Sequence, residues 1–450
     1  MNKQSESNIR DKANIKDNAQ VNILRKDFPL INNRKISYLD NASTTQKPQC
    51  VIDALTEFYG LHNANSHRGS YTISEESTQI LFESRKIVAE FINASPEEIV
   101  FTKNSTEALN SIANSIEKTI VITGQHNIVS TIIEHHSNFI PWQQLAKRTK
   151  ASFRIVDYNI EKNNLLDISK EVDENTLLVA FTAMSNVTGL MLDVKNIIKS
   201  IRKKNKNTLI IVDATQLIAH ENIDVLELDV DFLVFSGHKI YGPTGVGVVY
   251  AKKDILEKIS PFNYGGNMIN TVELYDSDWA QIPEKFEAGT QDTASIYALA
   301  KAIKYFKKNQ TTIISNENEV YAYALKELRR IKNVKIIGHE NIIYNNNNKV
   351  DNKDINNKYG PVISFTIDNL HPLDLATVCN EYEVCIRAGH HCTQPLHTKL
   401  GLVATSRISI GAYNNTKDID NAIKGIKHAI EIIVDNPKDK FKKLKRWLNG

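Results

Sequence analysis

Residues 209–240 read LIIVDATQLIAHENIDVLELDVDFLVFSGHKI, and this stretch decides the fold. It contains two short runs rich in β-branched and aromatic residues, LIIVDA (209–214) and DFLVFSG (231–237), separated by a more polar segment. Apolar runs of this length that alternate with amphipathic helical segments are typical of a mostly parallel sheet with helices on both faces. The stretch therefore predicts two strands of such a sheet, each followed by polar side chains.

Three earlier runs have the same character: IVFTK (99–103), TIVIT (119–123) and LLVAFTAM (177–184). We predict each of them to be a further strand, because helical patterns lie between them. The fold class is therefore predicted to be α/β, with a doubly wound, mostly parallel sheet in a large domain assigned to residues 38–305.

The second half of the chain has a different pattern of predicted helices and strands. This pattern indicates a smaller α+β domain, assigned to residues 306–450 together with 23–37. Its predicted elements are the helical ALAKAIKYFKKN (298–309) leading into it, the helix YAYALKELRRI (321–331), the strand VISFTI (362–367), a short strand ahead of Arg387 and the helix DIDNAIKGIKHAIEIIV (418–434). Residues 1–22 are polar and without periodicity, so we expect a tail. The Asn-rich residues 344–360 are expected to form a solvated insertion.

Composition and charge exclude several classes of protein. The chain has 450 residues, 41% of them hydrophobic and 24% charged, which is ordinary for a globular protein with more than one core. A net charge of +3 is too small to indicate a nucleic-acid or membrane partner. No apolar run approaches the ~20 residues that span a bilayer, and the first twenty residues contain no signal-peptide core. We expect a cytoplasmic protein, or alternatively one of an organelle matrix such as the plastid.

The four cysteines, Cys50, Cys379, Cys385 and Cys392, are too few and too unevenly spread to be a disulfide framework. We expect reduced thiols. Cys385 lies between Val384 and Ile386, a pattern that favours a strand.

Reactive side chains follow the two strands of the opening stretch, where ligands gather in parallel sheets. Lys239 lies in the turn after the second strand, and Asp213 ends the first, with Gln216 close behind. A lysine that loses its proton forms a Schiff base with an aldehyde, most commonly pyridoxal phosphate (PLP). A carboxylate at a neighbouring strand end would keep the pyridine nitrogen protonated. Taken alone, Lys239 would be interpreted as an ordinary surface lysine and Asp213 as a helix cap. The two together indicate a PLP site.

A phosphate site is predicted where IVFTK runs into a helix whose first turn offers Ser105 and Thr106. Free N–H groups and hydroxyls at a helix start bind anions, although the same residues also read as helix caps. Ser236 and His238, beside the lysine, are expected to complete this phosphate site.

Two further polar positions follow predicted strands. The doublet His135-His136 could supply an imidazole that stacks on the ring and moves protons, with a polar turn as the alternative. Asn186 could hydrogen-bond the substrate carboxylate or the ring, with a turn asparagine as the alternative.

Read together, SGHKIYGPTGVG (236–247), VDATQ (212–216) and RAGHHCTQPL (387–396) closely resemble the Suf-type cysteine desulfurases, which are fold type I PLP enzymes of the class V aminotransferase family. The resemblance extends from roughly Phe28 to Ile433. Further matching pieces are YLDNASTTQKP (38–48), HRGSYTIS (67–74), EHHSN (134–138), SNVTG (185–189), YGGNMI (264–269) and FEAGTQD (286–292).

The resemblance implies a role for each matching residue. It implies that Lys239 carries PLP, that Asp213 pairs with the ring nitrogen, that His135 stacks on the ring and that Gln216 bonds the phenolic oxygen. Those implied to hold the phosphate are Thr106, Ser236 and His238, with Thr290 reaching across from a partner subunit in a homodimer. Those implied to line the substrate site are Arg407, which clamps the carboxylate, and Asn186, His67 and Arg387.

The cysteine in RAGHHCTQPL distinguishes this motif from those of plain aminotransferases. The resemblance implies that Cys392 attacks the sulfur of L-cysteine, leaves L-alanine and holds the sulfur as a persulfide. A sulfur-acceptor protein of the Suf system would then receive the sulfur for iron–sulfur cluster assembly. Attack needs an ionised thiol, which positively charged neighbours such as His390, His391 and Arg387 are expected to favour. No metal site is expected, because His390, His391 and Cys392 are too close together to form a tetrahedral cage alone.

Two departures from the family pattern stand out. The chain reads VDATQ where the family often has V-D-G-A-Q or V-D-A-A-Q, and NSTE where it often has G-T-T-E. Ser105 keeps a hydroxyl, but Asn104 replaces a glycine at the start of the phosphate site. Three alternatives stay open: selenocysteine lyase activity, another class V PLP aminotransferase or lyase in which Cys392 is incidental, and a scaffold without catalysis.

Overall fold

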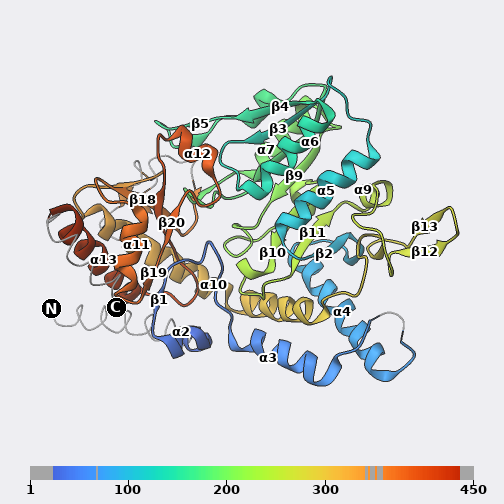
Figure 1. Cartoon of the computed structure of the whole chain (residues 1–450), viewed down its shortest axis with the longest axis horizontal. Coiled ribbons are helices and arrows are strands. Elements are labelled where there is room, and N and C mark those ends of the chain that lie inside the picture. The colour runs from blue at the N-terminus through green and yellow to red at the C-terminus, as the bar shows by residue number, and fades with distance from the viewer. Residues whose placement is uncertain (1–23, 67–68, 340–342, 345–349, 352–357, 436–450) are drawn as a thin grey trace, which may run out of the picture.

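We describe the chain from a computed structural model (Figure 1). The structure describes residues 24–66, 69–339, 343–344, 350–351 and 358–435. The predicted tail, residues 1–22, and most of the predicted insertion, residues 344–360, lie outside the described residues. Within the described part, no helix combines the length and the apolar character needed to cross a membrane.

The large sheet has seven strands and confirms the α/β, mostly parallel prediction. Their order is β2 (Ile99–Thr102), β11 (Gly247–Ala251), β10 (Phe232–Ser236), β9 (Leu209–Asp213), β7 (Thr176–Thr182), β3 (Asn127–Thr131) and β4 (Ser152–Val156). Only β11 is antiparallel to its neighbours within this sheet. The carboxyl ends of the other strands therefore meet along one edge, where the polar side chains that follow them are gathered.

Both faces of this sheet are covered by helices, because both faces of its strands are apolar. Ile210 belongs to the core beneath α4 (Thr72–Phe91), α7 (Val194–Lys204) and α10 (Thr293–Arg329), whereas Ile211 belongs to the core beneath α5 (Ser105–Thr119) and α6 (Ile140–Thr149). Successive side chains of a strand point to opposite faces, so a run such as LIIVD can contribute to two cores. This is the doubly wound arrangement that the opening stretch predicted.

The smaller unit is built on a four-stranded antiparallel sheet. Its order is β14 (Val334–Ile336), β18 (Val362–Ile367), β21 (Thr405–Ser409) and β20 (Arg387–Gly389). Helices α11 (Pro372–Asn380) and α13 (Thr416–Ala429) pack in the core of this unit. A short parallel pair, β1 (Ser37–Tyr38) with β19 (Val384–Cys385), adds an N-terminal strand to it and contains Cys385, as expected.

The remaining elements are short. The helices are α2 (Pro29–Arg34), α3 (Gln49–Glu57), α8 (Val225–Leu228), α9 (Lys253–Lys258) and α12 (Gln394–Lys399). The paired strands are β5 (Tyr158–Asn159) with β6 (Asn164–Leu165), β8 (Leu190–Met191) with β17 (Lys358–Tyr359), β12 (Ile269–Val272) with β13 (Ser277–Trp279), and β15 (Ile343–Tyr344) with β16 (Val350–Asp351).

One predicted strand is wrong, and two predicted helices are parts of one longer helix. TIVIT (119–123) is not a strand: α5 continues to Thr119, and the strand begins only at Asn127. Ile120 and Ile122 pack against the core while Val121 is 83% exposed, so the alternation belongs to a connecting loop that borders the core. The helices predicted at 298–309 and 321–331 are a single helix, α10, because the polar residues between them continue its helical turns.

Helix α10 also bears on the predicted domain boundary between residues 305 and 306, since it passes through that point without a break. In Figure 1 this helix runs beneath the large sheet and reaches the smaller one. Phe28, in the segment assigned to the small domain, packs on Tyr241, Tyr305 and Tyr413. The N-terminal segment thus contacts both units, and the division into two domains remains a prediction.

Candidate active site

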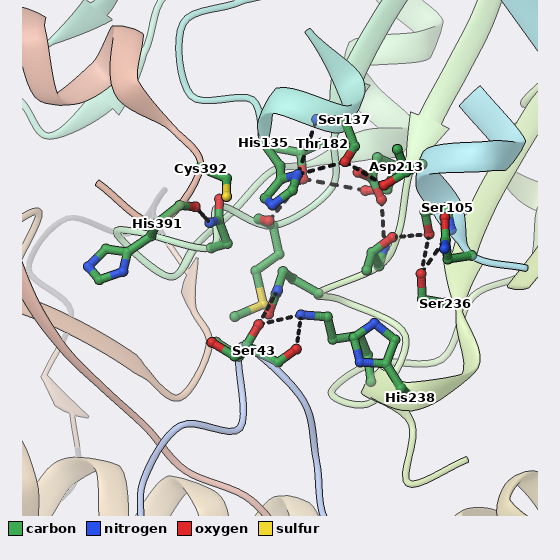
Figure 2. A pocket seen from close by; sticks show the side chains of 18 of the residues that line it. Ser43, Ser105, His135, Ser137, Thr182, Asp213, Ser236, His238, His391 and Cys392 are labelled. Atoms are coloured by element: carbon green, nitrogen blue, oxygen red, sulfur yellow. Dashed lines mark hydrogen bonds between the residues drawn. The ribbon is translucent and has the colours of Figure 1, made fainter. Parts of the chain in front are cut away.

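A cavity of about 290 Å³ lies at the carboxyl ends of the parallel strands (Figure 2). The sequence-predicted residues that line it are Lys239, Asp213, Gln216, Ser105, Thr106, His135, Asn186, Ser236, His238, Arg387, Arg407 and Cys392. They come from both units of the fold, since Arg387, Cys392 and Arg407 belong to the smaller one. Figure 2 shows Ser105 and Ser236 at one end of the cavity and Cys392 at the other, with His135 between them.

Lys239 has the environment of a reactive amine. It follows β10, and its Nζ donates to the backbone oxygens of Ala42 (2.5 Å) and Ser43 (2.8 Å). Burial lowers the pKa of Lys239 to about 7, assisted by the charge of Arg407 and opposed by Asp40 and Asp213. Near neutral pH a substantial fraction of this amine is therefore unprotonated, which nucleophilic attack on an aldehyde requires.

Asp213 is the buried carboxylate expected for a ring nitrogen. It ends β9, is 5% exposed, and accepts a hydrogen bond from the backbone N–H of Thr215 at 2.9 Å. Burial raises the pKa of Asp213, although the charge of Lys239 and hydrogen bonds from Thr215 lower it. A buried carboxylate is stable only with a hydrogen-bonding or charged partner, and a protonated ring nitrogen fits this position.

The predicted phosphate site is a cluster of hydroxyls at the start of α5. Ser105 Oγ lies 2.9 Å from Ser236 Oγ and 2.6 Å from Thr215 Oγ1, and the backbone N–H of Ser105 donates to Ser236 Oγ at 2.9 Å. On the lysine side, His238 Nδ1 is buried and has no hydrogen-bond partner among the residues that the structure describes. Hydroxyls, helix N–H groups and an unpartnered imidazole nitrogen suit a phosphate group.

The departure at Asn104 does not obstruct this hydroxyl cluster. Asn104 is the N-cap of α5, and its side chain accepts from the backbone N–H of Glu107 at 2.9 Å. Its backbone is extended, with φ −176°. The close approach is made instead by Gly247 on β11, where a Cβ would lie 2.6 Å from Asn104 Cα.

His135 has a defined tautomer. Its Nδ1 accepts from the backbone N–H of Ser137 at 3.1 Å, so the proton of the neutral ring resides on Nε2. Burial lowers the pKa of His135 to about 4, and the charge of Lys239 contributes in the same direction. His135 is therefore an uncharged ring at neutral pH, suited to stack on another ring.

Arg407 lies on β21 and is 3% exposed. Its Nη1 donates to the backbone oxygen of Asn186 (2.9 Å), and its Nη2 donates to Ser43 Oγ (2.8 Å) and Asp40 Oδ1 (3.3 Å). Its Nε is buried and has no hydrogen-bond partner within the described part of the chain. A buried guanidinium with an unused donor beside a cavity is suited to a carboxylate ligand.

Cys392 lies in the connection between β20 and α12, and its thiol is exposed. His391 and Cys392 both have left-handed backbones, with φ of 52° and 57°. Such conformations are uncommon for residues with a Cβ and persist when surrounding contacts enforce them. The connection is thus held in a strained shape that presents the cysteine.

Four hydrogen bonds join this connection, residues 390–394, which we call the cysteine loop, to His136 and Asn186. The backbone N–H of His136 donates to the oxygen of Cys392 at 2.6 Å, and His136 Nε2 accepts from the N–H of Gln394 at 3.1 Å. The side chain of Asn186 donates to the oxygen of His391 at 2.6 Å and accepts from Thr393 Oγ1 at 2.9 Å. Asn186 lines the cavity as predicted, but its amide group is already used to hold the cysteine loop.

The expectation that His391 is a cation beside the thiol is wrong. Burial keeps the pKa of His391 far below its usual range, so the ring is uncharged at neutral pH, and its Nε2 bonds Thr405 Oγ1 at 2.9 Å. Figure 2 shows this ring pointing away from the other labelled side chains. The cations that line the cavity beside Cys392 are instead Arg387 and Arg407.

One predicted residue is not in this cavity, and another cannot be placed. Thr290 lies with Asn65, Ser66 and Asn267 around a separate surface hollow. His67 lies outside the described residues. The other cysteines are also free thiols outside this cavity: Cys379 is buried, Cys50 is exposed and Cys385 is intermediate.

Sequence reasoning missed several residues of the site. Asp40 and Ser43 orient Arg407, Thr215 contacts both Asp213 and Ser105, and Thr393 anchors the cysteine loop. Asp40 and Ser43 belong to the quoted motif YLDNASTTQKP, and Thr215 to VDATQ, so the signal was present without an assigned role. Within the described residues, no group of three or more His, Cys, Asp or Glu side chains is arranged to hold a metal ion.

Comparisons with known proteins agree with this geometry. The family described as aminotransferase class V matches residues 37–422. A probable cysteine desulfurase of Streptomyces coelicolor is 38% identical, with 90% of this chain and 96% of that protein covered. One from Staphylococcus aureus strain Mu50 is 37% identical, with 91% and 97% covered.

Solved structures give the same picture. An apo cysteine desulfurase from Thermococcus onnurineus superposes with a TM-score of 0.82 at 33% identity, covering 91% of this chain and 98% of that one. The Escherichia coli cysteine desulfurase CsdA, in an S-sulfonic acid form, superposes with a TM-score of 0.80 at 29% identity, covering 92% and 98%.

Proposed function

The chain belongs to the class V aminotransferase family and is a PLP-dependent cysteine desulfurase, in which we propose that Lys239 holds the cofactor and Cys392 takes the sulfur. The observation that supports these two roles is that both side chains line one cavity, although they are 153 positions apart in sequence and come from different units of the fold. The overall reaction is L-cysteine plus the Cys392 thiol giving L-alanine plus a Cys392 persulfide.

The residues present fit PLP. Asp213 would hold the ring nitrogen, Gln216 the phenolic oxygen, His135 the ring face, and the hydroxyls at the start of α5 with His238 the phosphate. When bound, PLP supplies an aldehyde that bonds amines and a ring that withdraws electrons from the substrate. Every other step depends on the side chains of the chain itself.

Lys239 is the proton carrier. Because its pKa is lowered to about 7, the amine can take a proton from Cα of L-cysteine and release it again near neutral pH. Proton transfer by a positioned side chain generally accelerates a reaction by about 10²–10⁴-fold. When the Nζ of Lys239 is not bonded to the cofactor, the backbone oxygens of Ala42 and Ser43 hold it at the cavity wall.

Arg407 orients the substrate. Its Nε would bond the substrate carboxylate, while Asp40, Ser43 and the Asn186 oxygen keep the rest of the guanidinium in place. Arg387 lies on the adjacent strand, opposite Arg407 in the β20–β21 register, and adds a second positive charge. A carboxylate held at this end directs the substrate side chain toward Cys392.

Cys392 is the sulfur acceptor. Its thiolate attacks the sulfur of the bound cysteine, an S–S bond forms, and the C–S bond breaks with its electron pair remaining on the substrate carbon. Protonation of that carbon gives alanine. The exposed position of Cys392 then allows an external thiol to take the outer sulfur and restore the Cys392 thiol.

The partners belong to this proposal. A Suf-system protein that presents a thiol would receive the sulfur for iron–sulfur cluster assembly. The family resemblance implies a homodimer in which Thr290 reaches the partner's phosphate site, and the position of Thr290, apart from the cavity of its own chain, is compatible with that role. The compartment remains a sequence-based prediction, the cytoplasm or an organelle matrix such as the plastid.

The test is mass spectrometry of Cys392 after incubation of the holoenzyme with L-cysteine and no acceptor. We expect the peptide containing Cys392 to gain one sulfur, and Cys392→Ser to lose alanine formation by roughly 10³-fold while keeping its cofactor. Exposed Cys50 is the control, since Cys50→Ser should retain full turnover. Alanine formation that survives in Cys392→Ser would exclude Cys392 as the acceptor.

A further inference from the structure

Two arginine side chains lie next to each other at the end of the cavity that contains Cys392. Arg387 on β20 and Arg407 on β21 are direct partners in the antiparallel register, and both line the cavity. Residues paired in this way point to the same face of a sheet, and like charges placed directly opposite each other are destabilising. These two cations therefore need an anion that balances part of their charge.

Asp40 supplies that anion. Its Oδ1 lies 3.3 Å from Arg407 Nη2, and its Oδ2 lies 3.6 Å from Arg387 Nη1. Ser43 Oγ donates to Asp40 Oδ1 at 2.7 Å and accepts from Arg407 Nη2 at 2.8 Å, which fixes the carboxylate between the two guanidinium groups. The side chain of Asp40 is only 13% exposed, so solvent screens its charge weakly.

The charge at this end of the cavity matches L-cysteine. The two arginines and Asp40 together carry one net positive charge. L-Cysteine brings one carboxylate to it, because a free thiol with a pKa of about 8.5 is mostly uncharged at neutral pH. An amino acid with an acidic side chain would bring a second negative charge, and Arg387, the cation nearest to that charge, is already paired with Asp40.

We propose that Asp40 is a positioning residue that sets substrate specificity by charge. By pairing with Arg387 it makes the cavity favour an amino acid with an uncharged side chain over one with an acidic side chain. The inference rests on the proposed function, because it takes the substrate carboxylate to bind at Arg407. It goes beyond that function by giving a role in specificity to a residue that does not itself line the cavity.

The experiment compares two amino acids that differ by one side-chain carboxylate. L-Alanine is the product of the reaction, and L-aspartate has a carboxylate on Cβ, at the position that sulfur occupies in L-cysteine. Each is titrated into the holoenzyme, and the change in cofactor absorbance gives its dissociation constant. The ratio of the aspartate constant to the alanine constant measures the selectivity, and it depends neither on turnover nor on Cys392.

Asp40→Asn removes the negative charge with little change in shape. A unit charge about 12 Å away, at an effective permittivity of about 20, changes a binding constant about tenfold. We therefore expect the aspartate-to-alanine ratio to fall by about tenfold in Asp40→Asn. In the double variant Asp40→Asn with Arg387→Gln, the net charge returns to its original value, and the ratio should return close to that of the wild type.

Two further variants serve as control and as a second test. Asp254 is 68% exposed and follows β11 at the opposite edge of the large sheet, so Asp254→Asn removes the same charge far from the cavity and should leave the ratio unchanged. Arg387 is 54% exposed, so Arg387→Gln tests the charge balance even if Asp40→Asn does not fold. Losing this cation should raise the ratio by about tenfold.

The results that would overturn the inference are distinguishable. An unchanged ratio in Asp40→Asn or in Arg387→Gln excludes the role in specificity but leaves the proposed function intact, because L-alanine still binds. Equal weakening of both amino acids in Asp40→Asn also excludes it, since Asp40 would then only orient Arg407. No absorbance change with L-alanine in the wild-type holoenzyme would overturn the proposed function and the inference together.

Discussion

The turn that contains Lys239, Gly237–Lys239, which we call the lysine turn, and the cysteine loop are built in opposite ways. Lys239 directly follows a fully buried strand at the middle of the large sheet, and its amine is held by two backbone oxygens. Cys392 lies in a connection of the smaller unit, with an exposed thiol and two consecutive left-handed residues. The residue proposed to hold the cofactor is thus held by the core, and the residue proposed to pass its sulfur to another protein is presented at the surface.

The two regions also differ in how they manage charge. The pKa values of Lys239 and His135 are lowered by burial and by neighbouring cations, so both groups lose their charge readily. The cysteine loop instead shares the cavity with the guanidinium groups of Arg387 and Arg407. The cavity therefore combines an amine and an imidazole that lose their charge with two arginine side chains that keep theirs.

The largest expected effect comes from removing the amine. Lys239→Ala should reduce alanine formation by at least roughly 10⁴-fold, because both covalent attachment of PLP and proton transfer are lost. Borohydride reduction followed by mass spectrometry should show no PLP bound covalently at position 239. Lys103, whose side chain is 80% exposed, gives the matched control, and Lys103→Ala should behave as the wild type.

The pH dependence of PLP attachment tests the charge of the lysine turn. The amine is protonated below its pKa of about 7, so the attachment rate should rise about tenfold per pH unit below pH 7 and level off above it. In Arg407→Gln one cation that lowers this pKa is gone, so the rise should move to higher pH. Rapid mixing of apoprotein with PLP between pH 5.5 and 9 measures both profiles; an identical profile in the variant would show that Arg407 does not act on Lys239.

The smallest effect is expected from loosening the cysteine loop. Thr393 is fully buried and donates to Asn186 Oδ1, so Thr393→Val removes one of the four hydrogen bonds that join the loop to His136 and Asn186. Loss of one buried hydrogen bond corresponds to about 1 kcal/mol, or roughly fivefold slower persulfide formation. Single-turnover mass spectrometry of Cys392 measures this rate, and Thr393→Ser should restore it. PLP content should not change, because no lysine-turn contact is altered.

Much of this architecture was predictable from sequence. The strands LIIVD and FLVFS are continuous apolar runs followed by polar residues, and the structure has them as adjacent parallel strands. TIVIT was wrongly predicted to be a strand for the same reason, because a loop that borders the core has an apolar pattern as well. The single helix α10 was predicted as two helices, because the segment between them is polar. Local composition does not show that packing against the rest of the protein stabilises a helix across such a segment.

The sequence by itself determined which chemistry the chain contains: a lysine and an aspartate after neighbouring strands, hydroxyls at a helix start, and a cysteine within RAGHHCTQPL. These are local patterns, and local patterns can be recognised from the sequence alone. Only the tertiary structure decided that His391 is uncharged, that Asn186 holds the cysteine loop and that Thr215 contacts both Asp213 and Ser105. Burial and hydrogen-bond partners depend on segments brought together from distant parts of the sequence. A short motif does not show which residues will pack against it.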